Sequence, residues 1–413
     1  MSRHGSNPTS ETSMQHPFWL RNVRPYGGAA EDIEIVAGRI GARRPAAKLP
    51  LAAGDIDGGG QLLTPPLVEA HTHLDKTLWS LPWQPHSAAD NLRARIDNER
   101  RILREQTVPI AARAGALLEH CIAQGTQLLR CHVDADPELG WSHIEAMLTL
   151  RERYAGLVDI ELVTFPQAGL VTRPGAAELM RRALQAGVEV VGGLDPCGID
   201  GDPVAQLTQV FELAAEFDRG VDIHLHDGGE LGLWQIARIC DFTEQYRRQG
   251  RVMLSHAFCL GMLPWPKVAP LAARLAANGI SVVTTAPADI GVPPFAELSA
   301  AGVTVCLGSD GIRDAWSPMG NGDMLERVML QAYRFYERTD AGLRAAFDAG
   351  TVNGARAMGR DDYGLEQGQP AHFLLLPAET VGDAIALRPP QRTVIRYGRV
   401  IARDGKLLDS LLA

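Results

Sequence analysis

Apolar runs and amphipathic stretches alternate through the middle of the chain. Eight short apolar runs predict β-strands, at residues 67–71, 127–133, 160–165, 188–192, 221–224, 252–256, 280–284 and 303–307. Most are separated by stretches of helical length with one apolar face, at residues 110–123, 144–154, 176–186, 204–217, 231–247 and 268–277. This pattern predicts a (β/α)8 TIM barrel, with a doubly wound open sheet as the alternative. No GxGxxG loop opens the first βα unit, which favours the barrel.

The two ends of the chain carry a different pattern. Both contain short β-type runs broken by glycines, and neither contains a convincing helix. We therefore expect the ends to meet in one small β-sandwich domain, made of residues 17–64 and 365–413, beside a barrel of residues 65–364. Residues 1–16 are polar and predict a flexible N-terminal tail.

Composition excludes several classes of partner. The fractions of hydrophobic (46%) and charged (22%) residues are those of an ordinary globular protein, and the net charge of −9 argues against a nucleic-acid polymer or an anionic membrane. No apolar run approaches the length of a membrane span. The six cysteines include no CxxC pair, which is typical of reduced thiols. These features predict a cytoplasmic protein.

The first strand of the predicted barrel ends at a His-Thr-His motif. Residues two apart on a strand point to the same face, so His71 and His73 can reach one ion. Imidazole suits zinc and iron, and such an ion needs further ligands. By itself the motif is weak, because two histidines at this spacing can also be packed or solvated side chains.

The barrel places catalytic groups at the carboxyl ends of its strands. His224 ends the fifth predicted strand, His256 ends the sixth, and Asp310 follows the eighth. Metal-type residues at the ends of four strands favour a metal site over coincidence.

These residues, in this order, resemble the amidohydrolase superfamily. Within it the chain is most similar to the cytosine deaminase branch, with the triazine-degrading isopropylammelide aminohydrolases nearby. The likeness runs from about Leu20 through nearly the whole chain. It includes Pro-Pro-Leu-Val-Glu-Ala-His-Thr-His-Leu-Asp-Lys at 65–76, Phe-Pro-Gln-Ala-Gly at 165–169, and Gly-Ser-Asp at 308–310 followed by Trp316.

The resemblance implies one divalent metal ion held by His71, His73, His224 and Asp310. Zinc and iron are the first candidates and manganese is the third. Such an ion lowers the pKa of a bound water towards neutrality. Asp310 would accept the proton of that water and pass it to the departing nitrogen, and His256 would orient the hydroxide or polarise the substrate. The fourth predicted strand lacks the lysine that bridges two metals in binuclear relatives, so one ion is expected.

Five further residues are candidates for substrate contacts: Gln167, Trp316, Lys76, His226 and Asp195. The amide of Gln167 offers both a donor and an acceptor to a lactam or ureide edge, and Trp316 could stack on a flat ring. Each residue has a structural alternative. These are a turn cap for Gln167, packing for Trp316 and His226, a surface ion pair with Asp75 for Lys76, and a cap for Asp195.

The chain departs from the deaminase pattern in two places. Deaminases carry a glutamate three residues after the histidine of strand five, where this chain has Asp227, with Glu230 as the other candidate acid. The second carboxylate that follows the metal aspartate in cytosine deaminases is Gly311 here. Cytosine itself is therefore a doubtful substrate.

Together these features predict a metal-dependent hydrolase that cleaves a carbon–nitrogen bond of a small nitrogen heterocycle. Deamination with release of ammonia ranks first, and hydrolysis of a cyclic amide or an N-alkylamino group is the alternative. An inactive, metal-retaining binding protein is a third hypothesis. The family likeness also implies a small-molecule partner and a homo-oligomer.

Overall fold

The computed structural model of the protein describes residues 17–85 and 91–408, so the predicted tail at residues 1–16 lies outside the described part. Eight parallel strands form a sheet in sequence order. They are β6 (Leu67–Thr72), β7 (Thr126–Asp134), β8 (Asp159–Phe165), β9 (Val190–Leu194), β10 (Gly220–Leu225), β11 (Val252–His256), β12 (Ser281–Thr284) and β13 (Val305–Leu307). The first and last strands meet at a bridge between Thr72 and Asp310, where the Asp310 N–H donates to the His71 carbonyl at 2.8 Å. The prediction of a (β/α)8 barrel is confirmed.

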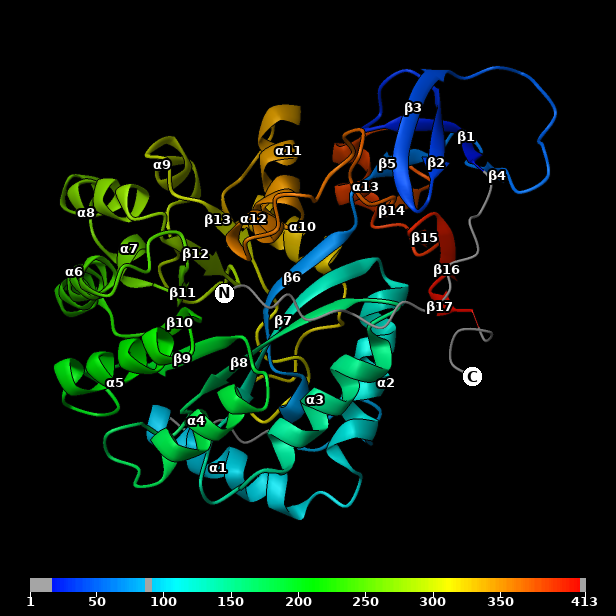
Figure 1. The fold of residues 1–413 in the computed structure, drawn as a ribbon. Coiled ribbons are helices and arrows are strands. Elements are labelled where there is room, and N and C mark those ends of the chain that lie inside the picture. The colour runs from blue at the N-terminus through cyan, green and yellow to red at the C-terminus, as the bar shows by residue number, and fades with distance from the viewer. Residues whose placement is uncertain (1–16, 86–90, 409–413) are drawn as a thin grey trace, which may run out of the picture.

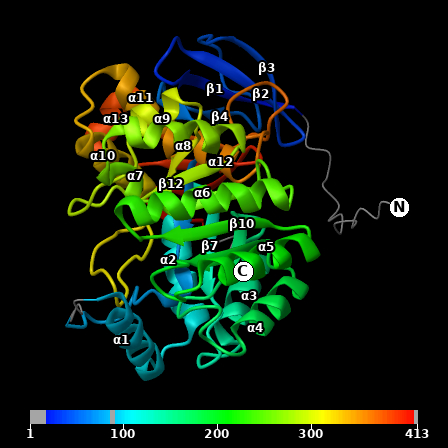
Figure 2. The same ribbon diagram turned by 90° about the vertical axis from the view of Figure 1, so that its left-hand side faces the viewer.

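Helices cover the outside of the strands (Figure 1). The predicted helices correspond to α2 (Ile110–Ala123), α3 (Ser142–Tyr154), α4 (Ala176–Gln185), α5 (Pro203–Glu216), α6 (Gly229–Gln245) and α8 (Trp265–Ala277). In Figure 2, α5, α6 and α8 lie in front of the strands. Their apolar faces pack with the outer faces of the strands in one large buried cluster.

Other helices have no counterpart in the predicted pattern. Four follow or accompany the last strands: α9 (Phe295–Ala300), α10 (Met324–Arg334), α11 (Asp340–Ala349) and α12 (Val352–Ala357). Three are α1 (Leu92–Glu105), the short α7 (Cys259–Met262) and α13 (Val381–Leu387). Charged residues occupy most of α1, so it contains fewer apolar residues than the predicted helices do.

The two ends of the chain build a second sheet beside the barrel (Figure 1). Its strands are β1 (Phe18–Pro25), β2 (Glu31–Val36), β3 (Arg39–Pro45), β4 (Ile56–Asp57), β5 (Leu62–Thr64), β14 (Phe373–Leu376), β15 (Thr393–Arg396), β16 (Arg399–Arg403) and β17 (Lys406–Leu407). The ends meet where β5 pairs antiparallel with β14, with Leu63 opposite Leu375. The expected small β-domain from both chain ends is thus confirmed. We propose that it spans residues 17–64 and 365–413, of which 409–413 lie outside the described residues, with the barrel at 65–364.

The described residues contain no helix that is long and apolar enough to cross a bilayer.

Candidate active site

Four side chains from three strands converge at the carboxyl end of the barrel. His71 ends β6 and His73 follows it, His224 lies on β10, and Asp310 follows β13. Asp310 Oδ1 lies 3.5 Å from His71 Nε2 and 3.2 Å from His73 Nε2. His73 Nε2 and His224 Nε2 are 3.4 Å apart. Three pairs of the predicted ligand atoms are thus 3.2–3.5 Å apart. Among the described residues, the sets of three whose ligand atoms all lie within 4.8 Å of one another are His71, His132 and His224, and His71, His256 and Asp310.

This arrangement fits a metal ion. Tetrahedral ligands about 2.1 Å from zinc lie about 3.4 Å from one another, close to the separations between these atoms. His71 Nε2 is buried and has no hydrogen-bond partner among the described residues. Removal from water favours a protonated Asp310, but the neighbouring imidazoles of His71 and His73 hold its pKa well below the usual range. The predicted donor set is thus three imidazoles with an ionised carboxylate, which suits zinc, iron or manganese.

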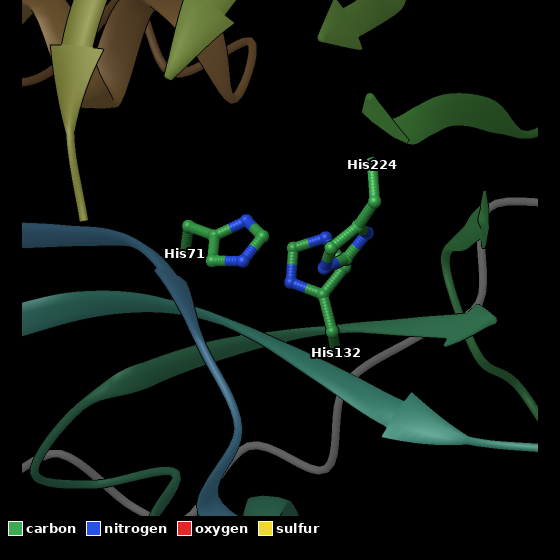
Figure 3. Close-up of side chains that lie close together, drawn as sticks. All are labelled: His71, His132 and His224. Carbon is green, nitrogen blue, oxygen red and sulfur yellow. The ribbon is translucent and has the colours of Figure 1, made fainter. Parts of the chain in front are cut away.

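A further histidine, His132 on β7, joins this centre. Ring nitrogens of His71, His132 and His224 lie within 4.8 Å of one another, and Figure 3 shows the three imidazoles turned together. His132 is fully buried, and burial together with the neighbouring His71 lowers its pKa to about 3. In the sequence, only its position near the end of the second barrel strand indicated that His132 could lie close to the metal-type residues.

A buried hydrogen-bond chain orients His71 from below. Asp222 Oδ1 accepts from the Ser255 hydroxyl at 2.7 Å, and Ser255 Oγ lies 2.8 Å from His71 Nδ1. The other oxygen of Asp222 pairs with Arg130 at 2.9 Å and lies 3.3 Å from His132 Nε2. In many metal sites, the ring nitrogen of a ligand histidine that does not bind the metal makes a hydrogen bond that fixes the orientation of the ring.

His256 ends β11 beside the ligands, and one of its ring nitrogens lies within 4.8 Å of ligand atoms of His71 and Asp310. Its Nε2 lies 4.0 Å from Asp310 Oδ2, and neither ring nitrogen has a hydrogen-bond partner in the described part of the chain. Its backbone has φ = +70°, an uncommon conformation for a residue with a side chain. A buried imidazole without a partner, held by a strained backbone, is typical of a functional position.

A pocket opens above the cluster. It is lined by His73, Lys76, Glu99, Gln167, Leu194, His224, His226, His256, Asp310, Asp314 and Trp316. Four of these residues (His226, His256, Asp310 and Trp316) also line a larger outer basin that continues from the pocket. The structure thus brings together eight of the eleven sequence-predicted site residues in one cavity, and His71 lies directly beneath it.

Lys76 and Gln167 form one wall of the pocket. Lys76 Nζ donates to Gln167 Oε1 at 2.9 Å and pairs with Glu99 at 3.2 Å. Lys76 is only 2% exposed, which excludes the alternative of a surface ion pair with Asp75. Asp75 instead pairs with His143 at 2.8 Å. Burial lowers the pKa of Lys76, but the neighbouring carboxylates Glu99 and Asp134 outweigh this effect and raise it.

His226 and Asp195 form a pair at the pocket wall. His226 Nδ1 lies 2.7 Å from Asp195 Oδ2, and Asp195 Oδ1 also accepts from the backbone N–H of Asp227 at 3.0 Å. Burial acts to lower the pKa of His226, but the negative charge of Asp195 has the larger effect, so the pKa is raised overall. Asp195 is buried and does not line the pocket. Its contacts with His226 and with the Asp227 N–H favour the capping alternative over a direct substrate contact.

Neither acid expected after strand β10 lines the pocket. Asp227 Oδ2 accepts from the Gly198 N–H and from the Gln235 amide, both at 2.9 Å, which directs the carboxylate towards the neighbouring loop. Glu230 is exposed and pairs with Lys267. The expectation that Asp227 or Glu230 acts as the acid is therefore not supported by their contacts. The carboxylates that do line the pocket beside Asp310 are Glu99 and Asp314.

The sequence pattern gave no signal for Glu99, which lies on α1. One Glu99 oxygen pairs with Lys76, and the other accepts from Trp316 Nε1. Helix α1 is thereby connected to the loop after β13, although more than 200 residues separate them in sequence. Trp316 is held in the pocket wall by this contact.

Comparison with known proteins places the chain in a family. A family model described as amidohydrolase matches residues 56–406. The chain belongs to the amidohydrolase family. Amidohydrolases of this kind are metal-dependent and act on carbon–nitrogen bonds other than peptide bonds, and the resemblance inferred from the His-Thr-His motif and Asp310 is confirmed.

Individual amidohydrolases match almost the whole chain. N-isopropylammelide isopropyl amidohydrolase of Pseudomonas sp. (strain ADP) is 31% identical over 388 residues, which cover 90% of this chain and 94% of that protein. The crystal structure of N-isopropylammelide isopropylaminohydrolase from Burkholderia multivorans is 41% identical with a TM-score of 0.91, covering 95% of this chain and 100% of that one. 5-Methylcytosine deaminase from Klebsiella pneumoniae, liganded with 5-fluorocytosine, is 28% identical with a TM-score of 0.80, covering 94% and 97%.

Proposed function

We propose that this amidohydrolase cleaves an exocyclic carbon–nitrogen bond of a small planar nitrogen heterocycle and releases ammonia or a small alkylamine. The observation that carries the proposal is one pocket in which the metal-type cluster faces the Lys76–Gln167 pair. A cation and an amide side by side suit a ring that presents carbonyl oxygens next to N–H groups.

We infer a single divalent ion held by His71, His73, His224 and Asp310, with zinc or iron ahead of manganese. When bound, such an ion supplies Lewis-acid activation of water near neutral pH. Strand β9 ends in Leu194 and offers no lysine for a second ion. We assign His132 a supporting role beside these ligands, because its Nε2 lies 3.3 Å from Asp222.

We assign each pocket side chain a separate role in the reaction. Asp310 accepts a proton from the attacking water and returns it to the leaving nitrogen, because its Oδ2 faces the pocket beside His256. His256 hydrogen-bonds the reacting oxygen. His226, oriented by Asp195, takes the place of the missing glutamate as the donor to the ring. Lys76, Gln167 and Trp316 position the ring.

Two leaving groups are compatible with this site. Ammonia is the expectation from the deaminase branch. An alkylamine is favoured by the outer basin, whose apolar residues Phe258, Pro287, Ile290 and Met319 lie beyond His256 and offer room for an alkyl substituent. The likeness to isopropylaminohydrolase over the whole length of that structure supports the same alternative. The complete ligand set argues against an inactive binding protein.

The test is a panel of aminopyrimidines, aminotriazines, their N-isopropyl derivatives and cyclic ureides, incubated with protein reconstituted separately with zinc, iron and manganese. Ammonia and alkylamine are quantified and the ring products are identified by mass spectrometry. We expect amine release from one ring class, and loss of it in Asp310→Asn. A mass gain of one water without amine would mean ring opening and would overturn exocyclic cleavage.

We also propose a cytoplasmic location, a small-molecule partner and a homo-oligomeric state. All six cysteines are free in the structure, which is compatible with a reducing compartment.

A further inference from the structure

Gly311 follows the metal-type residue Asp310 and is packed against a carboxyl group. A Cβ atom placed on Gly311 would lie 2.6 Å from Asp314 Cγ and 2.9 Å from Oδ1, and closer still to Oδ2. Real side chains do not approach to such distances. The Asp314 carboxyl therefore occupies the space that a side chain at position 311 would need.

Asp314 reaches this place through a tight turn. Its Oδ1 accepts from the backbone N–H groups of Trp316 at 2.8 Å and Ser317 at 2.9 Å. Its backbone N–H donates to the Ser317 carbonyl at 3.0 Å. The turn uses one carboxyl oxygen only, and Oδ2 accepts no hydrogen bond from the described residues. Asp314 is 3% exposed and lines the reaction pocket.

The other pocket carboxylates are already engaged. Glu99 uses both oxygens, on Lys76 and on Trp316, and Asp310 faces the histidine cluster. Burial raises the pKa of Asp314 to about 7, and the nearby charges of Glu99 and Asp310 act in the same direction. Asp314 lines the pocket, where a ligand or a water can donate a hydrogen bond to its free oxygen.

We propose that Asp314 is a substrate-binding residue whose Oδ2 takes a hydrogen bond from an N–H of the ring, and that Gly311 is the opening that admits this carboxyl. The carboxylate that the sequence lacks at position 311 is thus supplied from position 314. This inference rests on the proposed function and narrows it. The substrate must present a ring or amino N–H on the side of Asp310, next to the bond that is cleaved.

Three variants test the inference. Asp314→Asn keeps an oxygen for the turn but replaces the other oxygen with an amide, which cannot accept from an N–H. We expect kcat/KM to fall at least tenfold, mainly through KM, with Tm unchanged. Gly311→Ala should displace the carboxyl and give a similar loss. In an Asp314→Ala background, Gly311→Ala should have no further effect, because the atoms that it would meet are gone.

Asp202→Asn is the matched control. Asp202 also accepts a backbone N–H, that of Ala205 at 3.0 Å, but it caps α5 away from the pocket. The change in Tm and kcat/KM of Asp202→Asn shows what replacing a capping aspartate with asparagine does outside the pocket. If Asp314→Asn matches wild type within twofold and Gly311→Ala is harmless, Asp314 is a structural cap and the inference is wrong.

A binding measurement separates this inference from the proposed reaction. Cyanuric acid, a planar ring with N–H groups between carbonyls and no exocyclic amine, is titrated calorimetrically into zinc-loaded wild type and Asp314→Asn. Weaker binding to the variant supports the role of Asp314 even if no panel compound is turned over. Equal affinity contradicts it even where turnover is found. A wild type that neither binds the ring nor turns over a panel compound would overturn both proposals.

Discussion

At the scale of single residues, the site depends on groups that never touch a substrate. Ser255 orients His71 and is itself held by a hydrogen bond to the buried Asp222. Arg130 forms an ion pair with Asp222 and balances its negative charge. The hydrogen-bonded side chains come from two pairs of neighbouring strands, β6 with β7 and β10 with β11. Second-sphere hydrogen bonds of this type fix the ring orientation and raise metal affinity.

Ser255→Ala should weaken metal binding without unfolding the protein. It removes the hydroxyl between Asp222 and His71, so the ring loses its fixed orientation. We expect zinc affinity to fall by about tenfold or more, measured by competition with a chromophoric chelator.

Thr243→Val is the control for this change. It also removes a fully buried hydroxyl, one that donates to the Ile239 carbonyl at 2.7 Å within α6, away from the metal-type cluster. Its zinc affinity should equal that of wild type. Unchanged affinity in Ser255→Ala would show that the hydrogen-bond chain does not orient the ligand.

At the scale of elements, the closure of the barrel between β6 and β13 positions the ligands. The two strands approach so closely that a Cβ atom on Gly308 would lie 2.7 Å from the His71 carbonyl oxygen and 2.8 Å from its nitrogen. This approach brings Asp310, two residues later, to His71 and His73. Glycine at 308 is therefore part of the metal site, although it offers no ligand atom.

Gly308→Ala should separate the two strands and disturb the ligand geometry. The added methyl group meets backbone that cannot move aside easily, so we expect overpacking to cost about 1–3 kcal/mol, together with lower zinc affinity. Thermal unfolding and the chelator competition measure the two effects. Gly156→Ala, where no atom lies within 4 Å of the added carbon, is the control and should change neither. A Gly308→Ala protein with normal stability and affinity would contradict this account of the barrel closure.

At the scale of the whole molecule, the β-domain ties the two ends of the chain to the barrel. Its buried cluster combines Leu20, Ile33 and Leu63 from the first end with Phe373 and Ile395 from the second. An ion pair reinforces it, because the fully buried Asp32 pairs with Arg21 at 2.8 Å. Burial favours protonation of Asp32, but the Asn22 N–H and the two arginines Arg21 and Arg44 keep its pKa below the usual value.

Asp32→Asn should destabilise the β-domain in a pH-dependent way. A carboxylate with a lowered folded-state pKa stabilises above its ordinary pKa of about 3.9, and this contribution is lost as pH falls through the folded-state value. We expect the variant to lose about 1–3 kcal/mol at pH 7, and the difference from wild type to shrink below pH 4. Urea unfolding at several pH values measures this. A difference that stays constant down to the acid limit would contradict the ion-pair origin.

The sequence by itself determined the barrel and the metal-type cluster. Strand and helix periods report which face of each element is buried. Their places at strand ends marked His71, His73, His224, His256 and Asp310 as metal-type residues, and the resemblance to amidohydrolases implied which of them hold the ion. The strand ends converge in any (β/α)8 barrel, so no long-range information was needed.

Only the tertiary structure decided which carboxylates line the pocket. Asp227 has a suitable place in the sequence, but Gly198 and Gln235 bind its carboxylate from the neighbouring loop and helix. Glu99 lies on the highly charged helix α1, which the sequence pattern did not predict, and it reaches the pocket through contacts with Lys76 and Trp316. The direction of a loop side chain depends on partners distant in sequence, and no local pattern encodes those partners.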